Sequence, residues 1–213
     1  MTAPRHGGSR RGLLLPAWVV LLLSRHVGGD IALSRNWRAE HCVGNAALTH
    51  MVVAVASDAP GLAPILAAVN STYSNARDRD AVSFVAITRH VRRLHQLTAT
   101  HLPHVMRQMT ICGGFSDLLM QRPALLKLTT LRNSTRIKRK ELLSPFNFAA
   151  FYLPYVLRES RSVLYLDTDT VVKGDVGELE GLAMHGAPAA AVEDCSQKIF
   201  KYINFDMLSH YDS

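Results

Sequence analysis

The sequence has few cysteines, and none of them is paired at a metal-binding spacing. Cys42, Cys112 and Cys195 are the only three, and they lie far apart without a Cys-x-x-Cys motif. A metal site built from these cysteines is therefore not expected. In an oxidising compartment the three can form at most one disulfide, which leaves one free thiol.

The apolar run near the N-terminus is too short for an ordinary membrane-spanning helix, which needs about 20 apolar residues. It covers residues 13–23, follows several arginines and is closed by Arg25. A basic start and a short apolar segment are typical of a secretory leader. We predict a signal peptide or a short signal-anchor over residues 1–29, with a buried helix as the third interpretation. Residues 30–48 are expected to form a linker or stem.

Either kind of leader would send the protein into the secretory pathway. The expected location is the Golgi or ER lumen, with membrane association through an anchor or secretion as further options. Two N-glycosylation sequons fit that compartment, Asn70-Ser71-Thr72 and Asn133-Ser134-Thr135. The second is the better acceptor, because the first falls in a stretch that is predicted to be helical.

Acidic residues are absent from residues 1–29, which contain four arginines. The formal net charge of the whole chain is +7, so residues 30–213 carry a net charge of +3. The remaining basic run, residues 136–140 (RIKRK), has no interleaved aromatic side chains to stack on bases. We therefore expect no nucleic-acid partner. The run is interpreted as a solvated loop, with steering of an acidic partner or a membrane surface as the alternative.

Internal repeats and low-complexity segments are absent too, and 213 residues suit one globular domain behind a leader. The run MVVAVA, residues 51–56, predicts a buried strand. Residues 63–73 place apolar side chains at helical spacing, and residues 81–88 predict the next strand. Strand, helix and strand in such close succession predict a parallel βαβ unit and an α/β fold. Residues 90–132 are expected to add another helix and strand.

Ser144 and Pro145 predict the start of a helix, with the serine as N-cap and the proline at the first helical position. Pro154 should end or kink that helix. Further strands are predicted at residues 162–166 and 187–195, and residues 170–172 would continue the former or pair elsewhere. Four aromatic side chains are interpreted as core residues: Phe148, Phe151, Tyr152 and Tyr155.

Carboxylates follow three of the predicted strands. Asp58 follows the first, Asp167 and Asp169 follow the strand SVLYL, and Glu193 and Asp194 end the last. Ligands of open α/β sheets bind beyond the carboxyl ends of the strands. Two carboxylates about 4 Å apart repel by about 4 kcal/mol at an effective dielectric constant of ~20. A shared proton would relieve this repulsion, but a divalent cation that also binds a phosphate is the favoured explanation.

Several motifs together resemble glycosyltransferase family eight. The segments FNFAAFYLPYVL and SVLYLDTDTVVKGDVGEL carry most of the similarity, VVAVASDAPGLAPILAAVNSTYSNA resembles the family's first strand and helix, and AAAVEDC resembles its strand beyond the metal motif. The similarity covers roughly residues 49–208. Within the family the chain looks closest to glycosyltransferase-eight domain-containing and plant galacturonosyltransferase-like members.

The resemblance implies a GT-A (Rossmann-like) fold with a mainly parallel central sheet flanked by helices. It implies transfer of a hexose-type sugar from a UDP-sugar donor to a glycan or other acceptor, with net retention of the anomeric configuration. Asp167 and Asp169 would bind Mn²⁺ (or Mg²⁺) and the donor diphosphate. Ala56 and Asp58 match the stretch that receives the base and ribose. Glu193 and Asp194 would lie near the reacting sugars, and Asp194 is the favoured catalytic residue.

Two positions depart from the family pattern. Many members have an arginine where this chain has Ala150, and alanine cannot contact a donor phosphate or sugar. The family's third metal ligand is a histidine in a C-terminal His-x-x-Gly-x-x-Lys motif, which none of the ten histidines matches. His185 and His210 are expected on the surface. Residues 49–213 are therefore expected to be the N-terminal portion of a glycosyltransferase domain that is incomplete at its C-terminus.

Three functional hypotheses remain open at this point. The leading one is a manganese-dependent retaining glycosyltransferase of the secretory pathway. The second is a catalytically silent lumenal binding or scaffold protein that keeps the fold, which Ala150 and the unmatched histidine favour. The third, nucleic-acid binding through RIKRK, is disfavoured by the leader.

Overall fold

The computed structural model describes residues 19–23, 31–44, 51–121, 144–157, 159–160, 162–187 and 189–191. Within these residues the strands form one seven-stranded sheet in the order β2-β5-β4-β3-β6-β1-β7. The four strands β5, β4, β3 and β6 run parallel to one another, while β2 and β1 are antiparallel to their neighbours. The predicted α/β class with a mainly parallel sheet is therefore confirmed.

The predicted βαβ unit is present at the expected place. β3 covers Met51–Ala56, α2 covers Ala63–Asn75 and β4 covers Val82–Ile87. α2 buries Ile65 and Val69 against the sheet, as their helical spacing predicts. The stretch whose boundaries the sequence leaves open contains α3 (Val91–His101), the 3₁₀ helix η2 (Pro103–Gln108), β5 (Met109–Cys112) and α4 (Phe115–Gln121).

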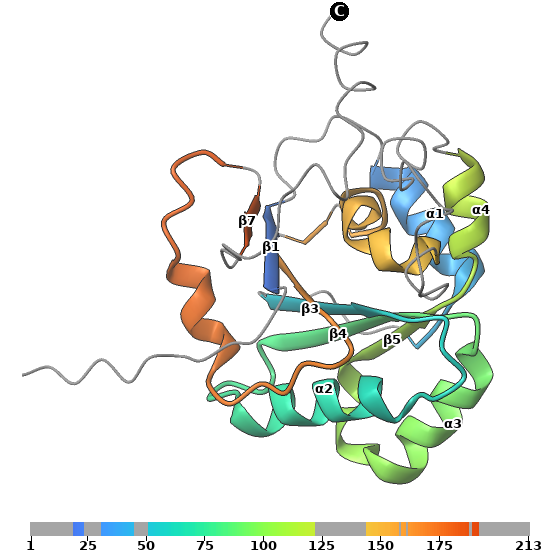
Figure 1. The fold of residues 1–213 in the computed structure, drawn as a ribbon, viewed down its shortest axis with the longest axis horizontal. Helices are drawn as coiled ribbons and strands as arrows, with labels where there is room; N and C mark the ends of the chain where they lie inside the picture. Colours follow the sequence, from blue (N-terminus) through green and yellow to red (C-terminus); the bar gives the residue numbers. More distant parts are fainter. Residues whose placement is uncertain are drawn as a thin grey trace, which may run out of the picture.

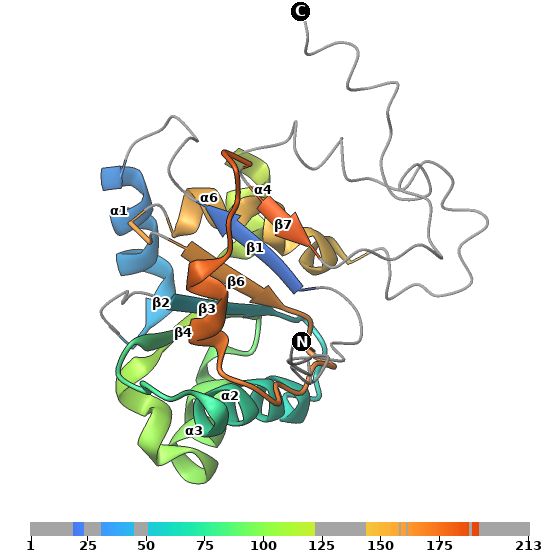
Figure 2. The ribbon, with the colours of Figure 1, turned by 90° about the vertical axis from the view of Figure 1, so that its left-hand side faces the viewer.

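Helices cover both faces of the sheet. In Figure 1, α2 and α3 lie on one face, and α1, α4 and the short helices before β6 lie on the other, an arrangement that Figure 2 shows from the side. Side chains of β3 alternate between the two cores: Met51, Val53 and Val55 pack on the α2 face, and Val52 and Ala54 on the α1 face. Every residue of β3 is buried, which explains why its sequence is continuously apolar.

The helix predicted before β6 begins at the expected residues, but it consists of two short helices rather than one. The Ser144 side chain accepts a hydrogen bond from the Phe146 N–H and caps the 3₁₀ helix η5 (Pro145–Tyr152), and α6 (Leu153–Val156) follows with Pro154 in its first turn. The core assignment of Phe151 is wrong, because this side chain is 50% exposed. In a 3₁₀ helix three residues complete a turn, so neighbouring aromatic side chains diverge more than in an α-helix.

Beyond β6 (Ser162–Leu166) the chain turns away from the sheet. Residues 170–172 form no strand, contrary to prediction, because both polar backbone atoms of Val172 bind side chains of α2. Its N–H donates to Ser71 Oγ (3.1 Å) and its carbonyl accepts from Asn75 Nδ2 (3.0 Å). The 3₁₀ helix η6 (Val176–Gly181), capped by Asp175, and the short strand β7 (Ala189–Ala191) complete the described chain.

Part of the stretch expected to be a linker is folded in the structure. α1 (Ile31–His41) buries Trp37 against the sheet, and β2 (Cys42–Val43) pairs with β5. A disulfide joins Cys42 to Cys112, and the Gly113 N–H donates to the His41 carbonyl (2.8 Å). The folded unit therefore includes residues that were expected to form a linker or stem.

The described part of the apolar N-terminal run, residues 19–23, forms a strand rather than a helix. β1 (Val19–Leu23) lies between β6 and β7 and is antiparallel to both. No helix among the described residues is long and apolar enough to cross a bilayer. Whether the run also acts as a secretory leader stays a prediction.

Candidate functional site at the carboxyl edge of the sheet

The strands that precede the predicted site residues end side by side. Val55 of β3 is paired with Leu166 of β6, and Ala56 is paired with Ile87 of β4. Asp58 and Asp167 therefore leave the sheet from adjacent strands at one edge. β7 runs parallel to β6 and ends at that same edge, but Glu193 and Asp194 lie outside the described residues.

Asp167 is a half-buried carboxylate held by the backbone of its own turn. The Thr168 N–H donates to its Oδ1 atom (2.8 Å), and the Thr170 N–H donates to its carbonyl oxygen (3.1 Å). Burial raises the pKa of the Asp167 carboxyl, the hydrogen bond from Thr168 lowers it, and the neighbouring Asp169 raises it further. Asp169 itself is exposed.

No basic residue in the described part of the chain forms an ion pair with Asp167 or Asp169. Burial and, secondly, the charge of Asp167 raise the pKa of Tyr165, so the phenol beneath the site stays protonated and neutral at ordinary pH. The two carboxylates therefore concentrate negative charge at the end of β6.

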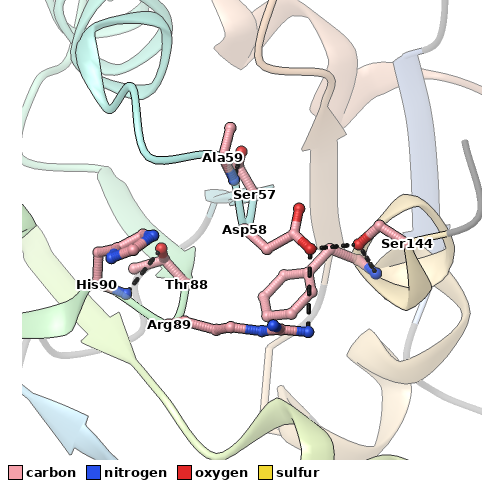
Figure 3. Close-up of polar contacts among 8 residues, drawn as sticks. Ser57, Asp58, Ala59, Thr88, Arg89, His90 and Ser144 are labelled. Atoms are coloured by element: carbon pink, nitrogen blue, oxygen red, sulfur yellow. Dashed lines mark hydrogen bonds and ion pairs between the residues drawn. The ribbon is translucent and has the colours of Figure 1, made fainter. Parts of the chain in front are cut away.

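Asp58 joins three separate elements at the same edge (Figure 3). Its Oδ2 atom accepts a hydrogen bond from Ser144 Oγ (2.6 Å) and lies 4.0 Å from an Arg89 guanidinium nitrogen. Arg89 also lies over the Phe146 ring, 5.4 Å from its centroid. Ala56, the last residue of β3, is buried, and its small side chain adds no charge to the edge.

Sequence reasoning missed the role of Ser144 and Arg89 at this edge. The N-cap of η5 was visible in the Ser144-Pro145 pair, but its contact with Asp58, 86 residues away, was not. Arg89 follows β4 just as Asp58 follows β3, so its position after a strand is the signal that could have indicated it.

The alanine and the histidines that were compared with the family pattern lie away from the paired aspartates in sequence and form no part of a described metal site. Ala150 is partly buried against the aromatic core on the α1 face, and His185 is exposed as predicted. His210 lies outside the described residues. Among those that the structure describes, no group of three or more histidine, cysteine, aspartate or glutamate side chains could hold a metal ion.

Asp167 and Asp169 follow a buried strand, and Asp58 follows the adjacent strand at the same edge. Carboxylate oxygens are the ligands that hard divalent cations prefer. Comparison with known proteins gives this site a context. The model of the family described as "Glycosyl transferase family 8" matches residues 33–209. The chain belongs to glycosyl transferase family 8. Membership of family 8 implies the GT-A fold, and the mainly parallel sheet with helices on both faces agrees with it.

Curated relatives of this family-8 chain include the human and Macaca fascicularis "Glycosyltransferase 8 domain-containing protein 2". Each is 30% identical over 153 residues, which is 71% of this chain and 41% of the relative. "Hexosyltransferase GAUT11" of Arabidopsis thaliana is 33% identical over 73 residues, 33% of this chain and 14% of that protein. The chain thus spans about two fifths of the length of the first relatives. No solved structure matches it.

Proposed function

We propose that this chain is the nucleotide-sugar-binding portion of a metal-dependent, retaining glycosyltransferase that moves a hexose from a UDP-sugar to a glycan or other acceptor. The observation that carries the proposal is that Asp58 and the Asp167/Asp169 pair follow two adjacent parallel strands and leave the sheet at the same edge. The family to which the chain belongs supports the reaction class.

The residues present fit a divalent cation in part. Asp167 and Asp169 supply carboxylate oxygens, which Mn²⁺ and Mg²⁺ accept, and no described basic side chain competes for them. The Thr168 N–H fixes the orientation of the Asp167 carboxylate. When bound, such a cation would neutralise the leaving diphosphate.

The other site residues have proposed roles in binding rather than charge neutralisation. Asp58, at the end of β3, would contact the ribose or base, and the Ser144 hydroxyl holds its carboxylate in place. The small side chain of Ala56, the last residue of β3, would allow the nucleotide to approach the strand end. Asp194, or else Glu193, would act on the reacting sugars, because the strand that precedes them ends at this edge.

We also propose that the protein works in the secretory pathway, in the Golgi or ER lumen. The Cys42–Cys112 disulfide supports this location, because disulfides persist in oxidising compartments and are rare in the cytosol.

Calorimetric titration of the purified chain with UDP, with and without Mn²⁺, tests the proposal. We expect binding that requires Mn²⁺ in the wild type and is lost in Asp167→Ala/Asp169→Ala. Glu180→Ala, which removes an exposed carboxylate from η6, is the control and should bind like the wild type. Equal UDP binding with and without Mn²⁺, or an unaffected double variant, would overturn the proposed site.

A further inference from the structure

The start of α3 carries a group of arginines beside the candidate site. Arg89 follows β4 directly, and Arg92 and Arg93 lie in the first turn of the helix; we name these three residues the basic cluster. All three are exposed, Arg89 to 59% of its side chain. Residues 81–116 contain no aspartate or glutamate, so neither α3 nor its flanking turns supply a counter-charge.

The acidic residues nearby leave the basic cluster largely uncompensated. Arg89 reaches Asp58 only at 4.0 Å, and Figure 3 shows its side chain extending toward that carboxylate. Arg92 and Arg93 form no ion pair within the described part of the chain. Asp80 lies at the opposite end of β4, where its carboxylate approaches the Gln108 side chain. A concentrated positive charge therefore adjoins the acidic edge.

We propose that the basic cluster binds the acceptor, and that the acceptor is an acidic glycan bearing carboxylate or sulfate groups. This inference rests on the proposed glycosyl transfer at the carboxyl edge of the sheet. An anionic acceptor that approached Asp58, Asp167 and Asp169 would be repelled. Arginines that follow β4 at this edge, in the turn after the strand and the first turn of α3, would offset that repulsion and orient the chain of sugars across α3.

Other polyanionic partners fit this surface less well. Single-stranded nucleic acid needs aromatic side chains for base stacking, and residues 85–114 contain no Phe, Tyr or Trp. Stable binding to a membrane surface usually combines basic residues with apolar side chains that insert. The large hydrophobic residues found exposed in the described chain lie outside α3 and η2: Val43, Phe151, Val171 and Leu182. Carbohydrate carboxylates and sulfates require neither feature.

A matched pair of charge reversals tests the proposal on the full chain. Arg93→Glu changes the basic cluster, and Arg107→Glu changes an exposed arginine at the far end of η2. Neither arginine forms an ion pair among the described residues, and the two variants have the same net charge. Binding to heparin and to polygalacturonate would be measured at several salt concentrations, with dextran as the neutral polysaccharide.

We expect at least one acidic polysaccharide to bind the wild type, more weakly as salt rises, and dextran not to bind. Arg93→Glu should weaken that binding by roughly fivefold or more, and Arg107→Glu by less than about twofold. Equal losses in the two variants would show a mere net-charge effect and overturn the proposal. Absence of polysaccharide binding, or equally tight binding to poly-glutamate or to phosphatidylserine vesicles, would also overturn it.

Titration with Mn²⁺ and UDP separates this inference from the proposed function. Arg93→Glu should bind UDP like the wild type, whereas Asp167→Ala/Asp169→Ala should lose UDP and still bind the polysaccharide. If the wild type binds the polysaccharide but does not bind UDP, the proposed function is contradicted. The assignment of the basic cluster as a glycan-binding surface would still stand.

Discussion

Asp167 is held in its turn at a cost to the folded state. An acid whose pKa is raised by folding holds its proton more tightly in the folded protein, so its charge weakens the fold above that pKa. The cost is full above the folded pKa, declines as the pH falls below it and is gone below the lower pKa of the unfolded chain. At neutral pH the charge of this carboxylate therefore does not stabilise the fold, which agrees with its proposed role in binding a cation.

Asp167→Asn should therefore unfold no more easily than the wild type at pH 7. The amide oxygen can still accept the Thr168 N–H, and the charge next to Asp169 is gone. The expected gain is below about 1 kcal/mol, because the side chain is only half-buried. Thermal unfolding with and without Mn²⁺ and UDP measures it: the ligands should stabilise the wild type and not the variant. A clear loss of stability in the ligand-free variant would contradict this account.

Ser144 combines two functions in one hydroxyl group. It caps η5 by accepting the Phe146 N–H and it donates to Asp58 at the carboxyl edge. Ser144→Ala should cost about 1–2 kcal/mol of unfolding free energy and weaken UDP binding. Ser144→Asn keeps a capping oxygen and an N–H donor. It should therefore recover most of the lost unfolding free energy, measured by urea unfolding, and most of the lost UDP affinity, measured by titration. An alanine variant as stable as the wild type would exclude the capping role.

At the scale of elements, α2 supports the turn that carries the paired aspartates. Ser71 and Asn75 bind the N–H and carbonyl of Val172, three residues beyond Asp169. The same helix holds the first sequon, whose Thr72 hydroxyl is buried and bound to the Ala68 carbonyl. The hydroxyl groups of this sequon thus serve the packing of α2, whereas the second sequon lies outside the described residues.

Ser71→Ala and Asn75→Ala should each lower the unfolding free energy by about 1 kcal/mol, because each leaves a Val172 backbone group without its partner. Both should also weaken Mn²⁺-dependent UDP binding through the displaced turn. Ser74→Ala, an exposed change on the same helix, is the control and should be neutral. Equal behaviour of all three variants in unfolding and titration would show that α2 does not position the aspartates.

At the scale of the whole molecule, the Cys42–Cys112 disulfide fastens the N-terminal elements to the sheet. It connects residues 70 positions apart, and Cys112 is fully buried beside the carboxyl edge. The Thr88 N–H, next to Arg89, donates to the Cys112 carbonyl (2.9 Å), so the disulfide also supports the end of β4.

Cys42→Ser/Cys112→Ser, or reduction of the wild type, should lower stability by about 2–4 kcal/mol. Unfolding curves with and without dithiothreitol measure the loss, and peptide mapping without reductant should recover Cys42 linked to Cys112. Cys195→Ser serves as the control and should unfold like the wild type. A map in which Cys195 is linked to either of the other cysteines would refute the pairing.

The sequence by itself determined the elements that depend on near neighbours. Continuous apolar runs predicted β3, β4 and β6, and the Ser144-Pro145 pair predicted the capped start of η5. The placement of Asp58 and Asp167 at strand ends followed from the same runs, because parallel strands in a βαβ unit end at one edge. These features can be predicted from the local spacing of apolar residues and from the right-handed crossover of βαβ units.

The tertiary structure alone decided which distant residues meet. It paired Cys42 with Cys112, turned residues 170–172 away from the sheet toward α2, and brought Ser144 and Arg89 to Asp58. It also folded α1 onto the sheet through Trp37 and left Phe151 exposed. Such contacts depend on the order of strands and the packing of helices across the whole chain, and no local pattern of residues records them.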